Sequence, residues 1–472
     1  MTGLETVPDA DGMGAERIGR GPAFALFRGL LAEPILASRA LHRDHGRFVQ
    51  LEYPIRKKGR SCYMSAIADA GLYRELMADG DLWRNIKINW GWPNNRAPDR
   101  LTRGMTRLRH GDREHYRLLL AAPLKRPAVE AMSVPMAEIA RNTVRAWPRE
   151  APFDIRPATQ TLAQELAVGL LFGRDRERAR EVTDLITLQI RGSWPVPSLA
   201  TLRWHLLAGR QERLLCDWIA DRTGDTDPSN LLSVLANNPD SAGNQPDAEM
   251  LAGILTFTYG AAFETCQNGL AWALILLTQH PTIRDQLTEE VTAACAGEIA
   301  SIDKIGNLPL LDSVVREAMR LFPPVPILFR KSTAETTLGG EVMPFKSRVM
   351  ISAHVINRDP GTYEDGDAFR PERWQTTKPS AYKYPVYGAG AHMCPGAVFG
   401  NQMLKIALAT ILTTHSIDMA DDARVDYRST ITMAPAGRPF IVLNDPSTRR
   451  PPHAVPGVLR QLVTLPALDE AA

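Results

Sequence analysis

Apolar residues recur at three- and four-residue spacing from Asp112 to about Leu321, with breaks at 192–197, at 225–229 and at Pro281. This spacing is typical of helices that bury one face, so the pattern predicts a long, mainly helical region. Its most apolar part, 251–277, is interrupted only by a few polar residues. Two further helices are expected at 68–77 and 397–414.

The rest of the chain predicts a small β region. Strand-like runs occur at 47–53 and 348–352, and the tryptophans and prolines of 83–104 predict a long loop. A glycine-rich loop at 388–396 precedes the last helix, and no βαβ alternation is visible, which argues against a Rossmann domain. We expect 1–20 to be disordered, 21–445 to form one domain, and the proline-rich tail 446–472 to lie over the surface.

Composition places the chain among soluble globular proteins, because 44% of its 472 residues are hydrophobic and 23% are charged. The net charge of +2 lacks the basic excess that binding of nucleic acid through phosphates requires, so no nucleic-acid partner is expected. The N-terminus has no signal-peptide pattern, and no uncharged apolar run is long enough for a membrane anchor. Five scattered cysteines without a CxxC pair argue against disulfides and structural zinc, and favour a reducing cytoplasm.

Candidate chemistry is concentrated in the segment Tyr387–Gly396, which reads YGAGAHMCPG. Glycines let a backbone approach a flat ligand, and amides at a helix N-terminus favour a thiolate, so Cys394 suits the axial position of a haem iron. His392 would then donate to a haem propionate. A glycine turn around an inert cysteine would give the same letters, so this segment alone leaves both interpretations open.

Glu317 and Arg320 lie three residues apart on a predicted helix and share a face. On spacing alone, an ordinary surface ion pair is the simpler interpretation. A second Glu-Arg pair follows at Glu372 and Arg373. An arginine that bridges Glu317 and this later loop would hold the loop that presents Cys394.

Glu264 and Thr265 lie side by side in the apolar helix. Because a carboxyl and a hydroxyl are costly to bury without a task, they could pass protons to a bound oxygen ligand. The alternative is a threonine that bonds its own i−4 carbonyl beside a glutamate on the helix surface. His115 and Arg117 could supply another propionate contact, or could simply begin a solvated basic helix.

Together these segments resemble the cytochromes P450, the haem-thiolate monooxygenases, over residues 40–445. Their order matches, and so does their spacing, with 52 residues from Thr265 to Glu317 and 74 from Arg320 to Cys394. The resemblance implies a mainly α, cytochrome P450 fold, with a large helical region and a small β region around a buried haem. It also implies a haem b cofactor between the helix of Thr265 and the loop of Cys394.

The resemblance also assigns site residues by position. Cys394 would be the proximal iron ligand, and Glu264 with Thr265 would deliver protons. The loop glycines are Gly388 and Gly396, the propionate ligands are Arg330, His392 and His115, and the structural triad is Glu317, Arg320 and Arg373. The expected substrate pocket contains the loop of Trp83 and Trp92, Phe257, Thr258, Ala261, Val325 to Leu328, including Ile327, and Thr432 to Ala434, including Met433.

The sequence departs from the family pattern at four positions. Tyr387 stands in place of a phenylalanine, and Ala262 in place of the glycine at which the oxygen-binding helix kinks. Leu119 stands where many members have a propionate arginine, and Met403 where a glutamate is frequent. None of these changes removes a residue that the reaction needs.

The resemblance implies insertion of one oxygen atom of O2 into a hydrophobic small molecule, such as a terpenoid, a polyketide or another natural product. The acid–threonine pair favours the route that uses O2 and two electrons, and we expect a separate ferredoxin and ferredoxin reductase to supply them. A docking face would include Arg113, Arg117, Lys125 and Arg126, although a merely solvated face would have the same composition. We expect a cytoplasmic monomer.

Two other functions remain open at this point. One is a haem-thiolate enzyme that is driven by peroxide or that performs a rearrangement. The other is a non-catalytic haem-binding or ligand-binding protein with this fold.

Overall fold

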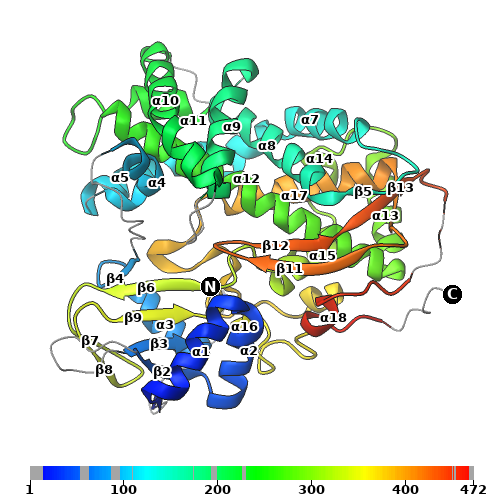
Figure 1. Ribbon diagram of the computed structural model, residues 1–472. Helices are drawn as coiled ribbons and strands as arrows, with labels where there is room; N and C mark the ends of the chain where they lie inside the picture. The colour runs from blue at the N-terminus through cyan, green and yellow to red at the C-terminus, as the bar shows by residue number, and fades with distance from the viewer. Residues whose placement is uncertain are drawn as a thin grey trace.

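The computed structural model describes residues 14–53, 63–86, 96–108, 110–173, 175–192, 199–225, 230–448, 450 and 453–466. Helices fill one side of the molecule, and the largest sheet lies at the opposite edge (Figure 1). This arrangement confirms the predicted mainly α fold with a small β region.

The longer helices are α1 (Arg20–Ala32), α2 (Pro34–His45), α3 (Ala70–Ala78), α5 (His110–Ala121), α7 (Ser133–Arg145), α8 (Ile155–Phe172), α9 (Arg176–Gly192), α10 (Leu199–Asp221), α12 (Ala248–Gln279), α13 (Pro281–Cys295), α15 (Pro309–Leu321) and α17 (Ala397–Thr414). The shorter helices are α4 (Ala97–Arg103), α6 (Arg126–Ala131), α11 (Leu231–Asn237), α14 (Ile302–Ile305), α16 (Ala353–Ile356) and α18 (Leu459–Leu462). The predicted last helix, 397–414, has the same bounds as α17.

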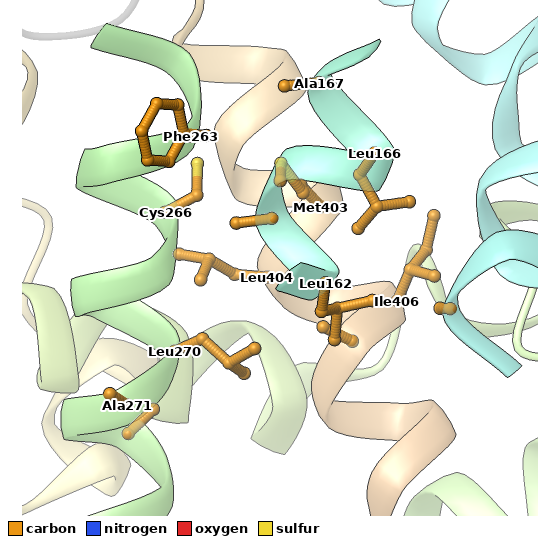
Figure 2. Close-up of a cluster of buried hydrophobic side chains, with 14 of the residues drawn as sticks. Leu162, Leu166, Ala167, Phe263, Cys266, Leu270, Ala271, Met403, Leu404 and Ile406 are labelled. Carbon is orange, nitrogen blue, oxygen red and sulfur yellow. The ribbon is translucent and has the colours of Figure 1, made fainter. Parts of the chain in front are cut away.

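Helix α12 runs through the centre of the helical side and contacts α4, α8, α10, α15 and α17. It begins where the Asp247 side chain accepts a hydrogen bond from the Glu249 amide, which satisfies one free N–H of the first turn. Figure 2 shows Leu270 of α12, Leu166 of α8 and Met403 of α17 among the side chains that fill the space between the three helices. Because α12 is buried on most sides, its sequence is apolar almost throughout.

The largest sheet has the strand order β1-β2-β3-β9-β6-β4. Its strands are β1 (Glu16–Ile18), β2 (Phe48–Glu52), β3 (Tyr63–Ile67), β4 (Trp83–Asn85), β6 (Leu328–Ser332) and β9 (Arg348–Ile351). The other strands are β5 (Phe153–Asp154), β7 (Thr336–Leu338), β8 (Glu341–Met343), β10 (Ser416–Met419), β11 (Arg424–Ser429), β12 (Met433–Arg438) and β13 (Phe440–Asn444). They form a β10-β13-β5 sheet and the two hairpins β7-β8 and β11-β12.

Three segments differ from the sequence expectation. Within the N-terminal segment expected to be disordered, Glu16–Ile18 form strand β1 and α1 begins at Arg20. The predicted loop at 83–104 contains strand β4 and helix α4, while Trp90 and Trp92 lie outside the described residues. The proline-rich tail does not merely cover the surface, because Val455, Leu459 and Leu462 are buried in the main core. Within the described ranges, no helix is long and apolar enough to cross a membrane.

Candidate active site

The glycine-rich loop 388–396 presents Cys394 immediately before α17. The Cys394 amide donates to the Tyr387 carbonyl at 2.7 Å, which closes the loop on itself. Gly388 has φ +71°, and a Cβ there would lie 2.7 Å from the His392 carbonyl oxygen. A Cβ on Gly396 would lie 3.8 Å from the Cys394 sulfur. The loop can therefore turn this tightly only because position 388 is a glycine.

The Cys394 thiol is exposed, yet the protein around it raises its pKa by desolvation. A hydrogen bond from the Gly396 amide and the charge of Arg117 act in the opposite direction and favour the thiolate. A ligand can therefore reach the Cys394 sulfur, although the protein around it partly removes it from bulk water. A soft thiolate that a ligand can reach in this way is suited to ligate a haem iron.

One stripe of α12 is open although most of the helix is buried. Phe257 is 44% exposed and Ala261, four residues later, is also exposed. Cys266, one turn further, points toward α17 in Figure 2. Burial raises the pKa of Cys266 to about 12, and the negative charge of a nearby Cys394 thiolate adds to this shift. Tyr387 has a raised pKa, chiefly from burial and also from the fields of both cysteines. Helix α12 and the Cys394 loop therefore lie close together at Cys266, one turn beyond the exposed Ala261.

The predicted acid–alcohol pair lies on this part of α12. The Thr265 hydroxyl donates to the Ala261 carbonyl at 2.7 Å, as the local alternative required. Glu264, however, is half-buried and does not lie free on the helix surface. Its carboxyl accepts a hydrogen bond of 2.8 Å from the Thr432 hydroxyl, and burial raises its pKa.

Basic residues gather on the sheet side of the loop. Arg330 of β6 is 6% exposed, and its Nε has no hydrogen-bond partner among the described residues. His392 donates to the Trp83 carbonyl at 3.2 Å, and burial together with the charges of Arg330, Arg113 and Arg117 lowers its pKa to about 4. A buried guanidinium beside this imidazole requires an anionic partner, and haem propionates are anions of this kind.

The other two predicted propionate contacts, His115 and Arg117, bond to different parts of the chain. His115 bonds the Pro239 carbonyl at 2.7 Å through Nε2, away from the loop. Arg117 donates to the Met393 carbonyl, next to Cys394. The structure therefore brings Arg117, Arg330 and His392 together around the loop, whereas the contact of His115 is made elsewhere.

Glu317, Arg320 and Arg373 are in direct contact and buried. The Glu317 carboxylate accepts from Arg320 at 2.8 and 2.9 Å and from Arg373 at 3.0 Å. Arg320 also donates to the carbonyls of Gly366 at 2.6 Å and Ala368 at 3.1 Å. This network fixes the loop before the cysteine segment to α15.

The predicted pocket residues divide into three groups by burial. Phe257 and Ala261 are exposed, while Thr258 and Ile327 are half-buried. Met433 is fully buried in the main core. Sequence reasoning missed Asn268, which donates to the Thr432 hydroxyl at 3.2 Å. Its only sequence signal is a polar residue four positions after Glu264 in an apolar helix.

The comparisons with known proteins agree with this geometry. A family model described as cytochrome P450 matches residues 215–439. The haem domain of cytochrome P450DA has the same fold, with a TM-score of 0.77 and 19% identity over 92% of this chain and 98% of that one. The chain is similar to the cytochromes P450 in sequence over 215–439 and in fold over nearly its whole length. The predicted P450 fold, haem-thiolate monooxygenase class and haem cofactor are confirmed, and this class uses O2 and a hydrophobic substrate.

Several curated relatives of this chain are named as oxygenases or monooxygenases. Pentalenene oxygenase of Streptomyces avermitilis is 26% identical over 70% of this chain and 77% of its own. Cyclooctatin synthase of Streptomyces melanosporofaciens is 28% identical over 56% of this chain and 62% of its own. Amorpha-4,11-diene 12-monooxygenase of Artemisia annua is 29% identical over 51% of this chain and 53% of its own.

Proposed function

We propose that this P450 hydroxylates a hydrophobic natural product of the terpene class. In the balanced reaction, R–H, O2, two electrons and two protons give R–OH and water. The observation that carries the proposal is the exposed Cys394 thiol on its glycine loop, with the half-buried Glu264 carboxyl and the exposed residues Phe257 and Ala261 on the nearby helix α12. A substrate there would lie against Phe257 and Ala261, beside the Glu264–Thr265 pair.

Haem b is the proposed cofactor, with Cys394 as its thiolate ligand and Gly388 and Gly396 shaping the loop. Arg330 and His392 would bind the propionates, while the position of His115 beside Pro239 supports it less well. A thiolate-ligated haem supplies the electron donation that favours O–O cleavage. Glu317, Arg320 and Arg373 would keep the ligand loop in place.

Glu264 and Thr265 would supply the two protons. Because the pKa of Glu264 is raised, it lies closer to neutral pH than the pKa of an ordinary carboxyl. Such a pKa suits a group that both gives and receives protons. Thr265 holds its hydroxyl at the open stripe through its bond to Ala261. Loss of either group should divert reduced oxygen to peroxide instead of product.

The terpene class is supported by the relatives' names and by the apolar residues Phe257, Ala261 and Ile327 on the predicted pocket wall. The two electrons would come from a ferredoxin and its reductase. Arg117 and Arg126, at the side of the Cys394 loop and on α6, fit part of a surface for an acidic partner. We place the enzyme in the cytoplasm as a monomer.

The test begins with the spectrum of the reduced protein exposed to carbon monoxide. The strongly red-shifted band of thiolate-ligated haem is expected for the natural protein and for the control Cys216→Ala, which changes a half-buried cysteine of α10. Cys394→His should give a histidine-like band instead. If Cys394→His keeps the thiolate band, Cys394 is not the ligand and the proposal fails.

Turnover then tests the chemistry, with pentalenene as the first substrate and a ferredoxin, its reductase and NADPH as electron source. Thr265→Ala should consume NADPH but release several-fold more hydrogen peroxide per NADPH. Product formed with hydrogen peroxide alone, at the same rate in Thr265→Ala, would point to the peroxide-driven alternative.

A further inference from the structure

Three side chains of α12 bond to one short segment at the turn of the β11-β12 hairpin. Glu264, Asn268 and Trp272 are spaced by four residues and therefore share one face of the helix. Glu264 and Asn268 bond the Thr432 hydroxyl at 2.8 and 3.2 Å, and Trp272 donates to the Met433 carbonyl at 3.0 Å. The proposed proton donor is thus tied to a hairpin 168 residues away in sequence.

The directions of the two hydrogen bonds at Thr432 follow from which groups can donate. A hydroxyl has one proton and accepts with its lone pairs. Because the Asn268 amide group donates to the Thr432 oxygen, the hydroxyl proton is free to point at the Glu264 carboxyl. Thr432 is 5% exposed and Asn268 is 4% exposed, so water has little access to replace either bond.

The hairpin segment is itself fixed. The Met433 amide donates to the Pro324 carbonyl at 2.9 Å, just before the predicted pocket residue Ile327. Met433 is fully buried, and the Trp272 ring stacks on Phe322 with centroids 4.0 Å apart. Thr432 therefore presents its hydroxyl from a rigid support.

We propose that Thr432 is a positioning residue for proton delivery: its hydroxyl holds the Glu264 carboxyl in one orientation beside Thr265, and Asn268 aims that hydroxyl. This inference rests on the proposed role of Glu264 as a proton donor. The Trp272–Met433 bond fixes the hairpin, whereas the Thr432 hydroxyl acts on the carboxyl itself.

Electrostatics predict in which direction the pKa of Glu264 should change when the Thr432 hydroxyl is removed. Burial raises the pKa of Glu264, while the Thr432 hydrogen bond and the charge of Arg428 on β11 lower it. A bond that lowers the pKa stabilises the carboxylate. Removing the hydroxyl should therefore raise the pKa of Glu264 and let its side chain adopt other rotamers.

The decisive variant is Thr432→Val, which keeps the shape of the side chain and removes the hydroxyl. Thr432→Ser restores the hydroxyl and serves as the rescue. Thr410→Val is the matched control, because Thr410 is 4% exposed on α17 and its hydroxyl has no hydrogen-bond partner among the described residues. All three should load haem and give the thiolate band with carbon monoxide.

The primary measurement is a pH titration of the ferric holoenzyme by difference infrared spectroscopy, with the Glu264 carboxyl band assigned by its loss in Glu264→Gln. Thr432→Val should move the midpoint of this band to higher pH, whereas Thr432→Ser and Thr410→Val should match the natural protein. An unchanged midpoint in Thr432→Val would overturn the inference.

The second measurement is hydrogen peroxide released per NADPH with pentalenene present. Thr432→Val and Glu264→Gln should both release several-fold more peroxide, and Thr432→Ser should return to the natural ratio. If Glu264→Gln is uncoupled and Thr432→Val is not, the positioning role is wrong. If Glu264→Gln itself remains coupled, the proposed function of Glu264 fails, and the infrared midpoint alone still decides whether Thr432 positions the carboxyl.

Discussion

A single carboxylate, Glu317, organises the region behind the cysteine loop. Besides its bonds to Arg320 and Arg373, it accepts from the Trp374 indole at 3.0 Å and from the Arg370 amide at 3.0 Å. Spacing alone made a surface ion pair the simpler interpretation, yet the exposed fraction of both Glu317 and Arg320 is 0%. The sequence predicts that these two residues share a face, but burial depends on the loop that folds over them.

We expect Glu317→Gln to destabilise the protein severely. The amide keeps the size of the side chain but leaves two buried guanidinium groups without a counter-charge, which costs about 3–5 kcal/mol. The melting temperature and the haem-to-protein ratio after purification should both fall. Glu372→Gln is the control, because Glu372 is exposed and its ion pair with Arg370 is worth about 0–1 kcal/mol. Equal melting temperatures for the two variants would contradict this account.

At the scale of elements, the glycine loop and α17 were predictable because their signals are local. Cys394, its glycines and the following apolar helix lie within one short stretch of sequence. Strand β4 has no such signal, since its three residues are extended only because they pair with β6, with Asn85 opposite Arg330. The bond from Thr432 to Glu264 was equally invisible, because only the folded hairpin brings the two residues together.

The loop itself leads to a test of backbone strain. Gly388 has φ +71° and ψ −174°, a region that is essentially restricted to glycine. Gly388→Ala should cost about 1–3 kcal/mol from strain alone. The displaced His392 carbonyl should also shift the cysteine loop, so thiolate ligation should weaken in the carbon monoxide spectrum. Gly111→Ala is the control, because a Cβ at Gly111 in α5 meets nothing within 4 Å. A full thiolate band in Gly388→Ala would show that the loop tolerates another path.

At the scale of the whole molecule, the C-terminal residues connect two parts of the site. Gln279, at the end of α12, is fully buried and bonds the Val455 amide at 3.2 Å and the His453 carbonyl at 3.3 Å. Further on, the Thr464 amide donates to the Asp367 carbonyl at 2.9 Å. Asp367 lies between Gly366 and Ala368, whose carbonyls accept from the Glu317–Arg320 network. The tail therefore links the helix of the proposed proton donors to the loop behind the cysteine.

This connection predicts that a substitution that destabilises the tail also weakens haem ligation by Cys394. Leu462 is 1% exposed and its carbonyl accepts from Arg358 at 3.3 Å, so it anchors the tail against the loop of Asp367. Leu462→Ala should cost about 2–5 kcal/mol through the cavity that it leaves. The variant should lose part of the thiolate band on mild heating, before the helices unfold by circular dichroism, because the loop loses its support first. Removal of residues 467–472, beyond this anchor, should change neither measurement. If the band and the helices are lost together in Leu462→Ala, the tail stabilises the fold as a whole and does not support the ligand loop specifically.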